Sequence, residues 1–238
     1  MATINLLYKR EYPINDSIKI IIPTVGEVLD NEDEYYSMVS ILTAMPIDLM
    51  YQLDDAGIDF TTINDYELFL LLFESLKEMK TSLVFGDLDL SNFETAVNNQ
   101  NGNIILVDRN TGVRIDRALH AKIANVIRKI NHLEKNIKKP GNEEAKKYMI
   151  QRAREKAKRH ANRASESQLE DLIVSMVNTE QYKYGFEGTR ELSIYQFNES
   201  VRQVINKVEY DHRMGGVYAG TISSKDLSQD DLNWLKHK

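Results

Sequence analysis

The chain has 238 residues, of which 42% are hydrophobic and 28% charged, values that are typical of a globular protein and exclude a chain disordered throughout. Cysteine is absent and no apolar run approaches 18 residues, which excludes disulfides, cysteine-based metal sites and a membrane span, and fits a reducing cytoplasm. The net charge of −6 is unevenly spread: residues 1–100 carry five Lys or Arg against 18 Asp or Glu, whereas residues 122–163 carry 14 against four, which predicts an acidic body joined to a basic segment.

The first predicted elements are two short strands, at residues 3–8 and 17–22, joined by a turn at residues 13–16. Thr24 and Glu27 then have the spacing of a capping box, in which each side chain accepts a hydrogen bond from the other residue's backbone N–H. This pair therefore predicts the start of a helix.

Three further helices are predicted in the acidic part. One begins near Asp33, and the next has Pro46 in its first turn and Gly57 at its end. The third begins with a second capping box at Asn64 and contains an uninterrupted apolar run at residues 68–73. Because a helix that is apolar on every side must be buried, we expect this run at the centre of the core.

The next stretch predicts a small sheet. Strands are expected at residues 83–85 and 103–107, with a short helix at residues 91–97 between them. Residues 110–112 (Asn-Thr-Gly) have the composition of a hairpin turn and lead to a strand at residues 113–115. The sheet would have three to five strands, depending on whether the N-terminal pair joins it.

Two helices are predicted in the basic segment, at residues 117–137 and 143–163, separated by Lys139-Pro140-Gly141. The first has a continuous apolar stripe with the 3.6-residue period of a helix. The second has apolar residues at 148–150, followed by alanines four residues apart, and its remaining surface is basic. The basic residues, which we predict to bind a partner, are Lys146, Lys147, Arg152, Arg154, Lys156, Lys158, Arg159 and Arg163.

The last part of the chain is again predicted to be helical. Ser167 caps one helix, a loop with three aromatic residues follows at residues 178–190, and Ser193 begins a long helix that we expect to end at Gly215-Gly216. A short final helix is predicted after Ser228.

Together these elements predict an α+β fold that is predominantly α-helical with one small sheet of short strands. Three regions are expected: an acidic helical domain with the sheet at residues 1–116, a basic two-helix arm at 117–165, and a helical segment at 166–238 that packs back on the first domain.

The sequence contains none of the common catalytic or nucleotide-binding motifs. No two of the five histidines have the i, i+4 spacing of a helical metal site. Asp87 and Asp89 are better explained as turn or capping acids than as metal ligands, and the glycine-rich residues 215–220 as a helix end than as an anion-binding loop. We therefore predict no catalytic residue, no cofactor and no metal site, and a protein that is not an enzyme.

The basic helix at 143–163 allows three interpretations. It could be a solvated face that also neutralises the acidic half, it could bind phosphates of a nucleic acid, or it could bind an acidic protein surface. Nucleic acid is disfavoured because the pI is near 5.5 and Tyr148 is the one aromatic residue in the segment. A second candidate surface comprises the aromatic loop at 182–186 and the tail at 216–235, although such aromatic residues also commonly fill the edge of a core.

Residues 20–29 (IIIPTVGEVL), together with Tyr35-Tyr36 and Pro46-Ile47-Asp48, resemble uncharacterised proteins from the structural gene clusters of tailed phages of low-GC Gram-positive bacteria. The closing residues 216–222 (GVYAGTI) and 231–234 (DLNW) share this resemblance. It implies a virion component or a tail-assembly factor, and the overall character is most similar to tail-assembly chaperones, which are small, helical, acidic and non-enzymatic. It implies no functional residue.

We therefore predict a non-enzymatic phage tail-assembly or virion interaction protein, located in the host cytoplasm or the virion, whose partners are other phage structural or tail proteins. One alternative is a structural subunit of the baseplate or head–tail junction. Another is a nucleic-acid-binding module that uses the helix at 143–163. Homo-oligomerisation stays open, and no membrane contact is expected.

Overall fold

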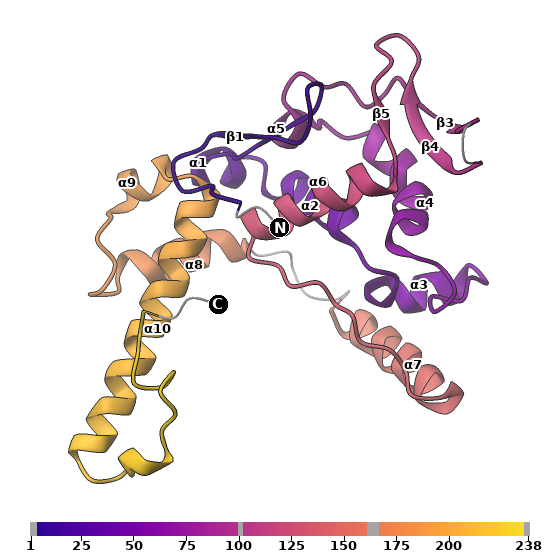
Figure 1. The fold of residues 1–238 in the computed structure, drawn as a ribbon. Helices are drawn as coiled ribbons and strands as arrows, with labels where there is room; N and C mark the ends of the chain where they lie inside the picture. Colours follow the sequence, from indigo (N-terminus) through magenta and orange to yellow (C-terminus); the bar gives the residue numbers. More distant parts are fainter. Residues whose placement is uncertain (1–3, 100–101, 161–166, 236–238) are drawn as a thin grey trace.

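The computed structural model describes residues 4–99, 102–160 and 167–235, and it confirms an α+β fold that is 53% helical (Figure 1). Within these ranges there are two small antiparallel sheets where one was expected. The strands are β1 (Glu11–Pro13), β2 (Lys19–Ile21), β3 (Phe93–Val97), β4 (Ile104–Asp108) and β5 (Arg114–Ile115). The helices are α1 (Val25–Leu29), α2 (Glu32–Thr43), η1 (Pro46–Leu49), α3 (Met50–Asp55), α4 (Asp65–Lys77), α5 (Ser82–Phe85), α6 (Arg117–Ile130), α7 (Glu143–His160), α8 (Gln168–Val177), α9 (Phe186–Glu191), α10 (Ile194–Tyr218) and η2 (Ser224–Asp226).

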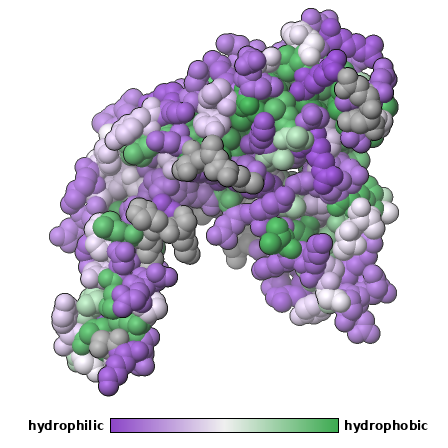
Figure 2. All heavy atoms as spheres, in the orientation of Figure 1, coloured by the Kyte–Doolittle hydropathy of each residue, from purple (hydrophilic) through white to green (hydrophobic). Residues whose placement is uncertain are grey.

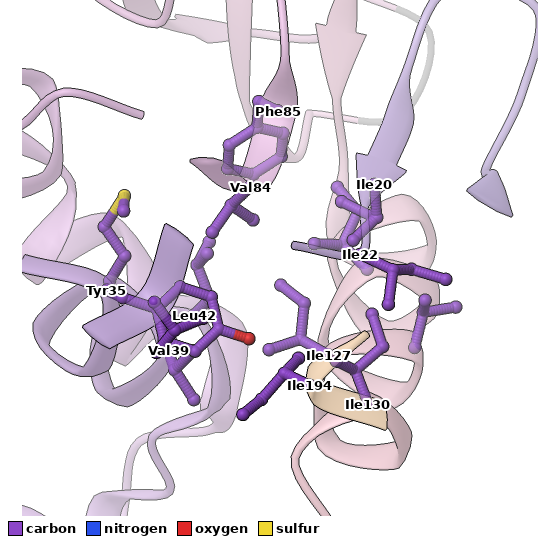
Figure 3. Close-up of a cluster of buried hydrophobic side chains, with 14 of the residues drawn as sticks. Ile20, Ile22, Tyr35, Val39, Leu42, Val84, Phe85, Ile127, Ile130 and Ile194 are labelled. Atoms are coloured by element: carbon purple, nitrogen blue, oxygen red, sulfur yellow. The ribbon is translucent and has the colours of Figure 1, made fainter. Parts of the chain in front are cut away.

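The main hydrophobic core gathers side chains from distant parts of the chain. Figure 3 shows residues of β2, of the position just after it and of α6 facing residues of α2 and α5, with the first residue of α10 completing the cluster. The labelled residues are Ile20, Ile22, Tyr35, Val39, Leu42, Val84, Phe85, Ile127, Ile130 and Ile194. Burial of these apolar surfaces is the largest favourable contribution to the stability of the fold.

The N-terminal hairpin pairs β1 with β2, so that Tyr12 lies opposite Ile20. The predicted strand at 17–22 is confirmed in its central residues. The predicted strand at 3–8 is wrong over residues 4–8, and residue 3 lies outside the described residues. The Asn15 side chain accepts hydrogen bonds from the backbone N–H groups of Ser17 (3.0 Å) and Ile18 (2.7 Å). This makes a tight turn, and the partner strand must therefore lie immediately before it.

The predicted helix starts are confirmed where a side chain caps the first turn. In α1 the backbone N–H of Thr24 donates to Glu27 Oε2 (2.7 Å), and the N–H of Glu27 donates to Thr24 Oγ1 (3.0 Å). The same reciprocal arrangement begins α4 at Asn64 and α10 at Ser193, and the hydroxyl of Ser167 caps α8. These bonds satisfy backbone donors that otherwise have no partner at a helix N-terminus.

Helix α4 is less completely buried than its apolar run suggests, because Leu71 is 55% exposed. One side of the helix places Phe69 and Phe73 in the main core, and another places Leu68 in a second cluster beside α3. The prediction of a helix buried all round is therefore wrong at Leu71, and α4 instead joins two hydrophobic clusters.

The three-stranded sheet has the order β3-β4-β5. The strand predicted at 103–107 is confirmed within one residue at each end, and the strand predicted at 113–115 is confirmed at residues 114–115. Two neighbouring predictions are wrong: residues 83–85 lie in α5, and residues 93–97 form β3 rather than a helix. Three-residue apolar runs do not separate strand from helix, and pairing with β4 determines the conformation of β3.

Helix α6 ends seven residues before the predicted boundary. His132 follows with φ +53°, the N–H of Leu133 donates to the Arg128 carbonyl (2.9 Å), and the N–H of His132 reaches the Lys129 carbonyl (3.5 Å). This is a Schellman motif with His132 in the left-handed position, which ends the helix and directs the chain away.

The C-terminal part packs on the N-terminal half through α8, α9 and the first turns of α10. The backbone N–H of Val25 donates to the Leu192 carbonyl, and that of Ile194 donates to the Pro23 carbonyl, both at 2.8 Å. Helix α6 also belongs to the main core, so that of the two helices assigned to a basic arm it is α7 that projects from the body (Figure 1). The division of the chain into three regions stays a prediction.

Helix α10 runs through Gly215 and Gly216, which were predicted to end it, and stops at Tyr218. The left-handed conformation that follows the helix is instead supplied by Gly220 (φ +75°). Gly216 is needed for a different reason: a Cβ at this position would lie 2.6 Å from Ile222 Cδ1. The glycine thus allows the tail to fold back against the helix.

Two smaller predictions in this region also need correction. The loop expected at 178–190 contains most of α9. After Ser228, reciprocal hydrogen bonds between Ser228 and Asp231 form a turn, but no helix follows in the tail as far as residue 235. None of the described helices is long and apolar enough to cross a bilayer.

Candidate partner-binding surface on helix α7

Helix α7, which carries the predicted partner-binding residues, follows the irregular segment 131–142 and lies beside α3 (Figure 1). Its first turn is capped by Asn142, whose side-chain oxygen accepts a hydrogen bond from the Ala145 N–H (2.8 Å). Glu143 and Glu144 lie in this first turn, where negative charge interacts favourably with the helix dipole.

One face of α7 packs on the body through a small apolar contact. Ile150 is 7% exposed and, with partly buried Met149, joins the second hydrophobic cluster. The other buried members of that cluster are Ile47, Leu53, Phe60 and Leu68, from η1, α3, the segment after α3, and α4. The helix is therefore held partly by hydrophobic burial.

Two of the eight predicted residues make ion pairs within the chain on this same face. Lys146 Nζ lies 2.5 Å from Asp59 Oδ2, and Arg154 Nη2 lies 2.9 Å from Asp54 Oδ2 and 2.5 Å from Asp55 Oδ1. The hydrogen bond from Lys146, with further bonds from Thr61, lowers the pKa of Asp59 to about 2. Because these pairs are at the surface, each contributes little stability, but together they fix which face of α7 is turned to the body.

The spacing of Lys146, Ile150 and Arg154 explains this orientation, since residues four apart lie on one helix face. The sequence contains that signal, but it does not reveal the acidic partners, which lie 87 to 100 residues before the cations with which they pair. The interpretation that the basic segment neutralises the acidic half therefore describes one face of the helix.

The solvent side of α7 is exposed and mainly basic, with Glu155 exposed among its cations. Figure 2 shows mainly hydrophilic side chains over this projecting arm. Its exposed cations are Lys147, Arg152, Lys156, Lys158 and Arg159. The Arg152 guanidinium lies over the ring of exposed Tyr148, 5.7 Å from its centroid. Arg163, the eighth predicted residue, lies outside the described residues.

The second candidate surface divides in the same way between core and solvent. Tyr182 is buried, and its hydroxyl lies 3.0 Å from Thr189 Oγ1, whereas Tyr184 and Phe186 are exposed. In the tail, Leu232 and Leu235 are exposed. The aromatic loop is thus partly a core element, and the tail keeps apolar side chains at the surface.

The acidic residues that could have suggested a metal site are explained by local structure. Asp89 accepts a hydrogen bond from the Ser91 N–H (2.9 Å), which confirms it as a turn acid. Among residues 4–99, 102–160 and 167–235, no cluster of His, Asp and Glu has the geometry to hold a metal ion.

Residues 158–238 match the family model of the YomV second domain. YomV is a protein of a Bacillus prophage region, and the match is consistent with a phage-related origin. The matched segment covers about a third of the chain, from the end of α7 to the tail, and leaves out most of the exposed basic face. No curated protein and no solved structure gives a significant match.

Proposed function

We propose that this chain is a non-enzymatic interaction protein of a tailed phage, acting in tail assembly or as a virion component. In this proposal it binds an acidic surface of another phage structural protein through the outer face of α7, which is the side that carries the five exposed cations.

The observation that carries the proposal is the division of α7 into two faces. Lys146, Ile150 and Arg154 hold the helix on the body, so the five exposed cations are presented on an ordered helix instead of a disordered basic tail. An ordered array of charges loses less conformational entropy on binding than a flexible one, and arginine can bind a carboxylate through two hydrogen bonds.

The assignment to a phage rests on different support. The match of residues 158–238 points to a prophage-related protein, and the resemblance of residues 20–29 and 216–222 points to the structural gene clusters of tailed phages. These two similarities concern a phage-related origin, and the role in tail assembly is what the proposal adds to it.

The proposal is tested by co-purification of tagged full-length protein with the tail and baseplate proteins of the same phage. The variant Lys156→Glu/Lys158→Glu reverses two exposed charges of α7, and we expect it to reduce capture at least tenfold. The matched control, Arg117→Glu/Lys122→Glu, reverses two exposed charges on α6 and should leave capture unchanged.

Two results would contradict the proposal. One is that the α7 variant and the α6 control capture the same amount of partner. The other is salt-sensitive binding to DNA or RNA that the α7 variant alone loses, which would support the nucleic-acid alternative. A mass-spectrometric inventory of purified virions then separates an assembly factor, which is absent from the particle, from a baseplate or head–tail junction subunit.

A further inference from the structure

A groove lies beside the first turn of α7, between η1, residues 60–63 and the irregular segment 131–142. It has a volume of about 610 Å³, which is within the range of sites that bind small ligands or a few protein side chains. Its apolar lining includes Pro46, Ile47, Phe60 and Ile63. The groove therefore combines these apolar side chains with polar and charged ones, including four lysines.

The rim of the groove is basic. Lys135 pairs with Asp65 (2.8 Å) and Lys146 with Asp59 (2.5 Å), whereas Lys138 and Lys139 are exposed and make no ion pair with any residue that the structure describes. Ile137, which immediately precedes Lys138, is 75% exposed. Two available cations beside an exposed isoleucine favour a ligand that combines carboxylates with bulky apolar groups.

The chain itself contains a segment with this chemistry. In residues 226–235 (DLSQDDLNWL), the side chains of Asp226 and Asp230 are exposed, as are those of Leu232 and Leu235. The Arg213 guanidinium holds the segment on α10 through Asp231, with Nη1 3.1 Å from Oδ1. The exposed carboxylates and leucines are thus presented on a folded tail.

Figure 1 shows the tail beside α10, and α7 on the other side of the molecule. The first turn of α7 borders the groove. We propose that the groove receives the tail of a second copy of this chain, with Asp226 and Asp230 facing Lys138 and Lys139, and with Leu232 and Leu235 on the apolar floor. Such a contact is head-to-tail, so it can propagate from copy to copy. It goes beyond the proposed function, since it uses the groove and not the outer face of α7.

The contact is small, and we therefore expect self-association that is weak, concentration-dependent and reduced by salt. Sedimentation velocity of the full-length protein over a wide concentration range, at low and high salt, measures it. Reversing the groove charges with Lys138→Glu/Lys139→Glu, or the tail charges with Asp226→Lys/Asp230→Lys, should each weaken association at least tenfold. The control Arg117→Glu/Lys122→Glu, which changes the net charge equally, should associate like the unmodified protein.

Mixing the groove variant with the tail variant is the decisive measurement. The acidic groove of one variant can then bind the basic tail of the other, and the mixture should associate more strongly than either variant alone. A protein that stays monomeric at every concentration, or an association that the groove and tail variants leave unchanged, would overturn the inference. A different result would contradict the proposed function, namely that the Lys156→Glu/Lys158→Glu variant captures partner proteins as well as the unmodified protein does.

Discussion

His120 is a titratable side chain inside the main body of the protein. It is 2% exposed, its ring stacks on Phe69 with centroids 4.2 Å apart, and neither ring nitrogen forms a well-aligned hydrogen bond within the described chain. Burial lowers the pKa of His120 to about 4, an effect that Asp65 and the Leu42 backbone oppose only in part. The folded state therefore strongly favours the neutral ring.

This makes the stability of the protein depend on pH. Between pH 6.5 and 4 the unfolded chain binds a proton at His120 that the folded chain does not, so stability falls as pH falls, by about 2 kcal/mol between pH 7 and pH 5. Burial also lowers the pKa of His132, which adds a change of the same sign. Urea unfolding at the two pH values measures the loss.

The variant His120→Leu should remove the larger part of this pH dependence, because an apolar side chain has no proton to bind and leaves no unpaired nitrogen. The control His212→Leu changes an exposed histidine on α10, and this variant should keep the pH dependence of stability. Equal pH dependence in both variants would show that His120 titrates normally.

Gly215 and Gly216 are adjacent in α10 but are expected to respond oppositely to alanine. A Cβ at Gly215 meets no atom within 4 Å, so Gly215→Ala should stabilise the helix by roughly 0.5–1 kcal/mol. A Cβ at Gly216 would displace Ile222 and loosen the tail. Limited proteolysis should therefore cut the tail faster in Gly216→Ala than in Gly215→Ala, and identical cleavage would contradict the packing described.

At the scale of whole elements, the sequence predicts helix starts better than it predicts short strands. Thr24, Asn64 and Ser193 carry the capping bonds that define their helices, so the signal is local. The conformations of residues 83–85 and 93–97 depend on pairing and packing with distant residues, and no local pattern contains that information.

The same distinction applies to the candidate site. The sequence identifies the basic residues of α7, but which of them face solvent depends on Asp54, Asp55 and Asp59, far away in the chain. The groove beside α7 was not predicted at all, because its apolar residues come from three separate segments. The sequence signal closest to the groove is the pair of lysines that precedes Pro140-Gly141.

The attachment of α7 to the body can be tested through Ile150. Replacement by alanine removes buried surface from a small cluster at the edge of the molecule, and we expect a loss of roughly 2 kcal/mol in local stability. Hydrogen exchange should speed up in α7 while α2 and α6 stay protected, because those helices lie in the main core. Lys147→Ala, on the exposed face, is the control; unchanged exchange in Ile150→Ala would mean that the ion pairs alone hold the helix.

At the scale of the whole molecule, the segment that matches the YomV second domain shares its core with the rest of the chain. Leu169, Ile173, Met176, Ile194 and Phe197 all belong to the main hydrophobic cluster, whose other members come mainly from residues before 131. Beyond Phe197, no described residue of α10 or the tail is fully buried. The described part of the matched segment therefore has no separate core of its own.

We accordingly expect a fragment of residues 158–238 to have no cooperative thermal transition, since the apolar face of α8 and the first turns of α10 would be exposed to water. Circular dichroism during heating measures this. Co-expression with residues 1–157 should restore both solubility and a single sharp transition, because the two pieces then rebuild one core. A fragment that melts sharply by itself would instead make the segment an independent unit, and the N-terminal half would then be an addition to it.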